Sequence, residues 1–131
     1  MDVSRNMLTN INEIDEQHKR IAFLSNKLYK VFEADKPPKE AKEALKNLFD
    51  YINYHFYFEE QNFEQFGFIF SARHIQEHKV LLDAISKFQN IVIDCTTEEQ
   101  YDFLLFIKEW FHKHFIQTDH EYVKVFKENG M

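Results

Sequence analysis

Apolar residues recur along most of the chain in the alternating three- and four-residue steps of an amphipathic α-helix. The first stripe comprises Ile14, His18, Ile21, Ser25, Leu28 and Phe32. It stops at Asp35–Pro38, where two prolines cannot continue a helix but can begin the next one. A second stripe runs from Ala41 to Phe66, and Gly67 after it is a typical C-terminal stop.

Two further stripes follow, from His74 to Val92 and from Leu104 to His114. Thr97, followed by acidic residues, is expected to cap the last long helix. We therefore predict helices over residues 13–34, 39–66, 71–94 and 98–116, with a short helical tail over 119–128. Because the connections are short, consecutive helices should be antiparallel. The expected fold is one all-α domain, 1–131: an up-down-up-down four-helix bundle after an extended N-terminal segment.

Composition agrees with this prediction and excludes several functions. The chain has 15 Phe and 6 Tyr but only 2 Gly and 2 Pro, too few turn residues for a β-sandwich. A net charge of −6 without a basic run disfavours nucleic-acid binding. Cys95 is the only cysteine, which excludes an internal disulfide and a cysteine-ligated metal cluster. We find no signal peptide or membrane span, so we expect a cytoplasmic protein that does not bind membranes.

Ionisable side chains occupy the predicted inward stripes, where Leu or Ile would be expected. They are His18, His55, Glu59, His74, His78 and His114. Burying such groups is costly unless they are paired or bind a metal. His112 and His120 do not fit these stripes and are expected to be solvated.

The turns predict that these side chains meet at one level of the bundle. In an antiparallel hairpin, residues equidistant from the turn lie side by side. His18 and His55 are equidistant from Asp35–Pro38, and His55 and His78 from the region of Gly67. His78 and His114 are equidistant from Thr96. Five imidazoles and a carboxylate should therefore form one metal site, with more ligands than a structural zinc ion uses. Imidazole-rich sites suit Fe, Cu, Ni or Zn, and a carboxylate that can bridge favours a pair of ions.

These residues and their spacing resemble the hemerythrins, in particular the single-domain bacteriohemerythrins. The resemblance rests on His18 after Ile14-Asp15-Glu16-Gln17, His55 and Glu59, His74 and His78, and His114 followed five residues later by Asp119. It implies two iron ions, one held by His74, His78 and His114 and the other by His18 and His55. Glu59 and Asp119 would bridge both ions, together with an oxo or hydroxo group. Asp119 comes from the resemblance alone, and its spacing requires the helix to loosen or turn after His114.

A coordination count connects this ligand set to function. The implied ligands fill all but one of about twelve octahedral positions, and the open one lies on the two-histidine iron. Dioxygen could bind there and become a hydroperoxide by taking one electron from each ferrous ion and a proton from the bridging hydroxide. Ile21, Phe56, Trp110 and Phe111 lie one turn or less from a ligand and are expected to line the oxygen pocket. Two departures from the family stand out: no Trp precedes the first helix, and Phe111 replaces a Leu.

We therefore predict a monomeric, non-enzymatic protein that binds dioxygen reversibly to carry, store or buffer it. Which protein receives the oxygen is left open. One alternative is a di-iron enzyme, such as an oxidase, a peroxidase or a nitric-oxide-handling activity. The other is an oxygen or redox sensor, although a chain of this length should lack an output domain.

Overall fold

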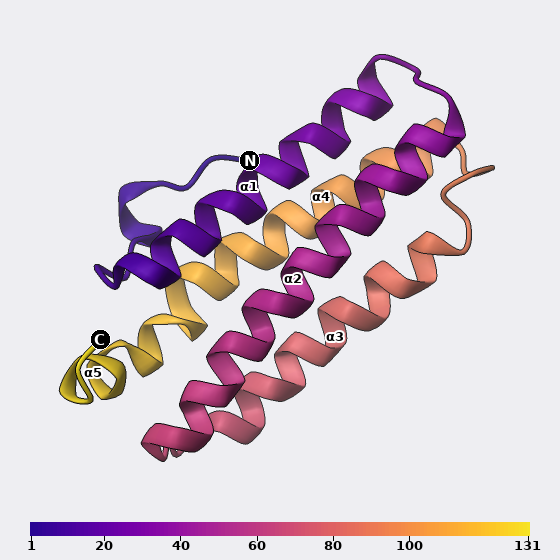
Figure 1. Ribbon diagram of the computed structural model, residues 1–131. Coiled ribbons are helices and arrows are strands. Elements are labelled where there is room, and N and C mark those ends of the chain that lie inside the picture. The colour runs from indigo at the N-terminus through magenta and orange to yellow at the C-terminus, as the bar shows by residue number, and fades with distance from the viewer.

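The computed structural model describes all 131 residues and contains helices but no strands. Four long helices form the body of the molecule (Figure 1). The elements are η1 (Arg5–Met7), α1 (Asn12–Glu33), α2 (Pro38–Phe66), α3 (Ser71–Gln89), α4 (Thr97–Lys113), η2 (His114–Thr118) and α5 (His120–Glu128). None of these helices combines the length and the apolar character that a membrane crossing needs.

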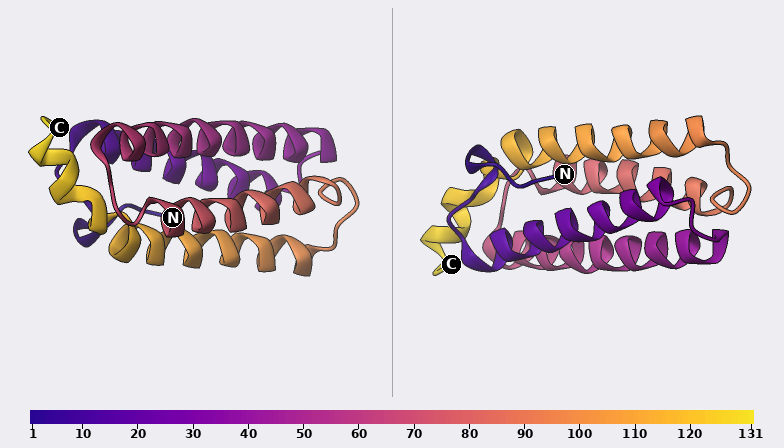
Figure 2. Two further views of the ribbon diagram at one scale, coloured as in Figure 1. Left: turned by 90° about the horizontal axis from the view of Figure 1, so that it is seen from below. Right: turned by 90° about the horizontal axis from the view of Figure 1, so that it is seen from above.

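The four long helices lie side by side along one axis (Figure 2). The α1–α2 and α3–α4 connections lie at one end of the molecule, and the α2–α3 connection lies at the other (Figure 2). The short α5 also lies at this second end, beside the start of α1 (Figure 2). We call it the α5 end, and the opposite one the distal end.

Helix boundaries follow local chemistry and differ from the sequence prediction at several ends. α4 stops at Lys113 instead of residue 116, because the π-helical η2 begins at His114. α3 ends at Gln89 instead of residue 94, where Asn90 and the β-branched Ile91–Ile93 are poor helix formers. Val92 is nevertheless buried, so the apolar stripe continues through a turn. The cap of α4 is Thr96 instead of Thr97, because Thr96 and Glu99 form a reciprocal capping box.

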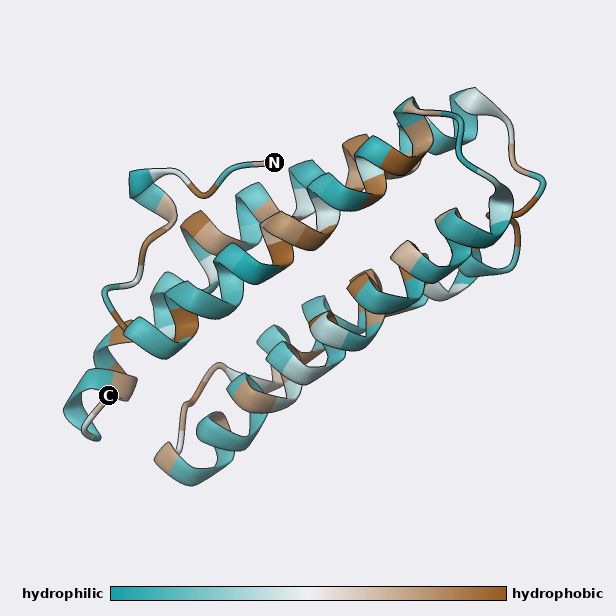
Figure 3. Cartoon of the chain, turned by 45° about the horizontal axis from the view of Figure 1, so that its top comes forward, coloured by the Kyte–Doolittle hydropathy of each residue, from teal (hydrophilic) through white to brown (hydrophobic).

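The apolar stripes meet in a core of 18 buried residues that fills the bundle from its middle to the distal end. Hydrophobic and hydrophilic residues are interspersed along each long helix (Figure 3), as in helices with one buried face. A second cluster closes the α5 end and consists of Ile11, Ile14, Phe63, Phe68, Tyr122 and Phe126.

The N-terminal segment is fastened to α1 by Asp15. Its carboxylate accepts hydrogen bonds from the Thr9 N–H and hydroxyl, both at 2.8 Å, and from the Asn10 N–H at 3.0 Å. Asn10 adopts φ of 63°, a left-handed conformation that Asn tolerates better than most residues. This lock holds Ile11 in the cluster at the α5 end.

Candidate metal centre

Seven ionisable side chains meet inside the bundle, between the two apolar clusters. They are the residues singled out from the sequence: His18, His55, Glu59, His74, His78, His114 and Asp119. None is more than 2% exposed. His112 and His120 are exposed, as expected. α1, α2, α3 and the η2 turn that continues α4 therefore contribute to one buried polar cluster.

The side chains form two groups, each compact enough to surround a cation. One contains Glu59, His74, His78, His114 and Asp119, and the other contains His18, His55 and Asp119. Within each group the candidate ligand atoms lie within 4.8 Å of one another. Asp119 belongs to both groups.

Asp119 spans the two groups with its two oxygens. Oδ2 lies 3.0 Å from His18 Nε2. Oδ1 lies 3.0 Å from His74 Nε2 and 2.9 Å from His114 Nε2. The carboxylate thus faces one group with each oxygen, which is the arrangement of a bridging ligand.

Glu59 occupies the corresponding position on the α2 side. Its Oε1 lies 3.0 Å from His55 Nε2 and 3.3 Å from His78 Nε2, so it too faces histidines of both groups. Oε2 lies 3.8 Å from His74 Nε2. The two carboxylates are therefore the charged groups between the five imidazoles.

A π-helical turn brings Asp119 to the cluster. η2 is a five-residue π-helix in which the Asp119 N–H donates to the His114 carbonyl at 2.8 Å. In an α-helix, residues five apart point in different directions, but the wider π turn places them on one face. This is the loosening after His114 that the sequence spacing requires.

The buried polar atoms of the cluster suit a bound metal. The Nε2 atoms of all five histidines and all four oxygens of Glu59 and Asp119 lack a hydrogen-bond partner. Buried polar atoms are almost always hydrogen-bonded or coordinated, so a convergent set without partners requires an explanation. Imidazole nitrogens and carboxylate oxygens are suitable ligands for iron, and cations between them would satisfy every one of these atoms.

Three histidines are oriented from behind by a second side chain. His55 Nδ1 lies 2.6 Å from Gln17 Oε1, His78 Nδ1 lies 2.8 Å from Glu60 Oε2, and His114 Nδ1 lies 3.2 Å from Glu77 Oε2. A proton on each Nδ1 leaves Nε2 free to face the centre. The sequence pattern did not single out Gln17, Glu60 and Glu77 for this role. A usable signal exists, because each adjoins a ligand in the sequence.

Electrostatics tie the carboxylates to the histidines. Burial acts to raise the pKa of Asp119, but the facing histidines, His114 first, hold it well below its usual value. Burial acts to lower the pKa of His114, but Asp119 and Glu77 raise it to about 10. The hydrogen bond from His114 lowers the pKa of Glu77 to about 2. The carboxylates thus stay ionised, and their negative charge must be balanced. A metal ion would displace protons from the imidazoles and supply the balancing positive charge.

Aromatic rings cover the outer faces of several histidines. Phe56 stacks on His78 with ring centroids 3.6 Å apart, and Trp110 stacks on His114 at 4.3 Å. Of the expected pocket residues, these two therefore lie against the three-histidine group. Phe115 stacks on His18 at 3.7 Å, and no sequence signal had singled it out. Ile21 and Phe111 are fully buried on the distal side of the centre.

Comparisons with known proteins agree with this geometry. A profile of the hemerythrin HHE cation binding domain matches residues 9–126. A bacteriohemerythrin of Methylococcus capsulatus is 30% identical over 114 residues, which cover 87% of this chain and 86% of that relative. One of Clostridium acetobutylicum is 26% identical over 118 residues, 86% of this chain and 91% of the relative. One of Pseudomonas aeruginosa is 35% identical over 81 residues, 62% of this chain and 52% of the relative. With a buried His/Glu/Asp cluster able to hold metal and a profile match over most of its length, the chain belongs to the hemerythrin family.

Proposed function

We propose that the protein binds dioxygen reversibly at a non-haem centre of two iron ions, and so carries, stores or buffers dioxygen. His74, His78 and His114 would hold one ion, and His18 and His55 the other. Glu59 and Asp119 would bridge them. The observation that carries the proposal is the position of these two carboxylates, each within 3.3 Å of histidines from both groups.

The chain's own residues have distinct tasks in this centre. A bound iron pair supplies the redox chemistry that reversible dioxygen binding needs. The His18–His55 side supplies fewer imidazoles than the other, so we assign the open position for dioxygen to it. The stacked rings and the buried Ile21 and Phe111 exclude water, which would otherwise promote loss of the bound oxygen. Gln17, Glu60 and Glu77 hold three imidazoles in the orientation that coordination requires.

We also propose that the four long helices run in up-down-up-down order. An up-down-up-down bundle places one histidine-bearing face of each long helix at the same level. The positions of the connections in Figure 2 support this order. We propose that the functional unit is a monomer, because all seven proposed ligands belong to one chain.

A spectroscopic cycle tests the function. The iron-loaded protein is reduced without air, its visible spectrum is recorded, air is admitted, and the oxygen is then removed under argon. We expect a spectral change that reverses on deoxygenation over several cycles. A one-way change would contradict reversible binding, and steady turnover of an added reductant or of nitric oxide would indicate an enzyme instead.

A further inference from the structure

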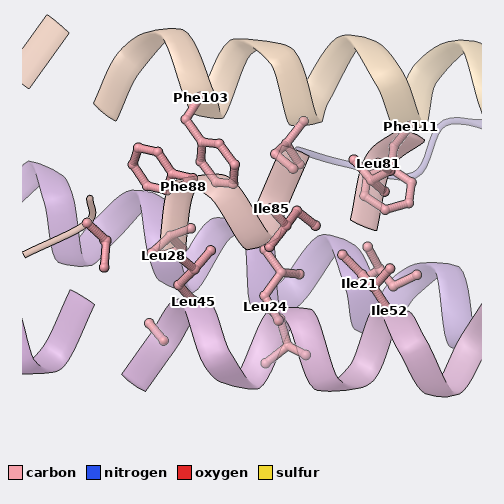
Figure 4. Packing of buried hydrophobic residues seen from close by; sticks show 14 of the residues in the cluster. Ile21, Leu24, Leu28, Leu45, Ile52, Leu81, Ile85, Phe88, Phe103 and Phe111 are labelled. Atoms are coloured by element: carbon pink, nitrogen blue, oxygen red, sulfur yellow. The ribbon is translucent and has the colours of Figure 1, made fainter. Parts of the chain in front are cut away.

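A layer of four apolar side chains closes the distal side of the metal centre. Each lies three residues from a histidine, and each comes from a different long helix. They are Ile21, Ile52, Leu81 and Phe111, and none of them is exposed. Figure 4 shows the four together at one level of the bundle. Any molecule that reaches the centre from the distal side must pass this layer.

The next layer contains one exception to apolar packing. This layer lies one helical turn further from the centre, four residues along each helix from the first. Its residues are Ser25, Leu48, Ile85 and Ile107. All four are buried, but the α1 position holds a small hydroxyl instead of a large aliphatic group. The Ser25 Oγ has no hydrogen-bond partner. The α1 stripe therefore has a notch one turn from Ile21.

A cavity of about 430 Å³ opens from the surface to this notch, between α1 and α4. Ser25 and Ile107 lie at its buried side. The rest of the wall is mostly apolar, with Asn26 and Lys108 as its other polar residues, and consists of Met1, Tyr29, Tyr101, Leu104 and Leu105. The cavity exists where a Leu or Ile at position 25 would otherwise fill the core. Its floor is thus separated from the centre only by the layer that contains Ile21 and Phe111.

The opposite side of the centre offers no comparable approach. The cluster of Ile11, Ile14, Phe63, Phe68, Tyr122 and Phe126 closes it, and none of these side chains is more than 4% exposed. The other two sizeable hollows lie at the distal end and on the outer α1–α2 surface, and Ser25 lines neither. Of these three hollows, the α1–α4 cavity is the one that Ser25 lines.

We propose that dioxygen reaches the centre through the α1–α4 cavity. The gas would bind transiently in the notch beside Ser25 and then pass between Ile21 and Phe111. The occupant is a small apolar gas, since the walls are mostly aliphatic and aromatic and the notch offers one hydroxyl. Passage requires motion of the Ile21 and Phe111 side chains and no rearrangement of the helices. This inference rests on the proposed oxygen-binding function and adds where the gas enters.

Stopped-flow oxygen association with the reduced, iron-loaded protein tests the route. Ser25→Leu restores the apolar stripe and should slow association by about tenfold, equivalent to about 1.4 kcal/mol on the access barrier. Ser25→Ala keeps the notch open and should associate at least as fast as the unmodified protein. Ala41→Leu, beside the hollow at the distal end, adds bulk to the same core away from the route and serves as the control. Should Ser25→Leu not fold, Leu105→Trp at the exposed mouth should slow association without disturbing the core.

Xenon provides a readout that does not depend on oxygen chemistry. Crystals of the iron-loaded protein under xenon pressure should show the gas beside Ser25, and crystals of Ser25→Leu should not. Equal association rates in Ser25→Leu and the unmodified protein, or xenon only at other sites, would overturn the route. A protein that takes up xenon beside Ser25 but never binds oxygen would overturn the proposed function and leave the gas site standing.

Discussion

Glu59 and Asp119 differ from the five histidines because each faces both groups of ligands. Glu59→Ala or Asp119→Ala should therefore prevent a stable pair of ions and leave well under two irons per chain. His18→Ala removes a ligand from one group only and should retain both metals while losing reversible oxygenation. Elemental analysis after iron-replete expression measures the difference, with the exposed Glu64→Ala as control. Full iron content in Glu59→Ala would refute the bridging role.

Phe111 fills space next to the centre that a smaller side chain would leave open. It is fully buried, and its ring centroid lies 5.0 Å from that of Phe115. The Phe115 ring in turn stacks on His18. Phe111→Leu should bind oxygen faster and lose it to autoxidation faster, with iron content unchanged. The fold should tolerate the change at a cost on the order of 1 kcal/mol. Phe103→Leu at the distal end is the matched control, and rates equal to those of the unmodified protein would show that Phe111 only packs the core.

The helical period identifies six of the seven residues at the centre, and Asp119 comes from the family resemblance. The supporting residues adjoin ligands in the sequence, but the period does not show what they contact. The ligands follow the helical period, so the pattern of the chain is enough to place His18, His55 and Glu59 on inward helix faces. Glu60 and Glu77 sit on the flanks of their helices, and their partners depend on how each helix is rotated against its neighbour. Phe115 stacks on His18 from within the π turn, four residues after Phe111 on the same inward stripe. Periodicity thus places Phe115 in the core, but it does not supply the partners of Glu60 and Glu77.

At the scale of the elements, α1 is held to the segment before it by the Asp15 carboxylate. Asp15→Ala removes the acceptor of three hydrogen bonds and leaves the Thr9 and Asn10 N–H groups without it. We expect a loss of about 2–3 kcal/mol in the free energy of unfolding, because hydrogen bonds to a charged acceptor are strong. Urea denaturation measures it, with the exposed Glu13→Ala on the same helical turn as control. Equal losses in both variants would show that Asp15 acts only through helix charge.

The ends of the helices were harder to predict than their faces. Gly67 ends α2 where expected, with φ of 67° in the left-handed region that glycine favours. The end of α3 was misplaced because the apolar stripe continues through Val92 without a helix. An apolar pattern indicates which residues face the core. It does not indicate whether the backbone there is a helix or a turn, because either can place a side chain in the core.

At the scale of the whole molecule, metal and fold should be linked. Five imidazoles and two carboxylates are buried without hydrogen-bond partners at their facing atoms, and bound cations would coordinate the imidazoles and balance the charge of the carboxylates. The iron-loaded protein should contain about two irons per chain and unfold at a clearly higher temperature than the iron-free protein. Calorimetry of both forms measures this. A zinc content of one per chain with no iron, or identical melting temperatures, would contradict it.

The segment just before α1 and the C-terminal α5 both close the same end of the bundle, so the two ends of the molecule differ in how tightly they are packed. The Asp15 lock, α5 and the second cluster lie at the α5 end, whereas a hollow of about 460 Å³ lies at the distal end. Regions with fewer buried contacts open at lower free energy. In native-state hydrogen exchange, the amides of the distal turns should therefore exchange well before those around His55 and His74. Fraying would then begin far from the ligands, so the protein could loosen at one end while it still retains its metal.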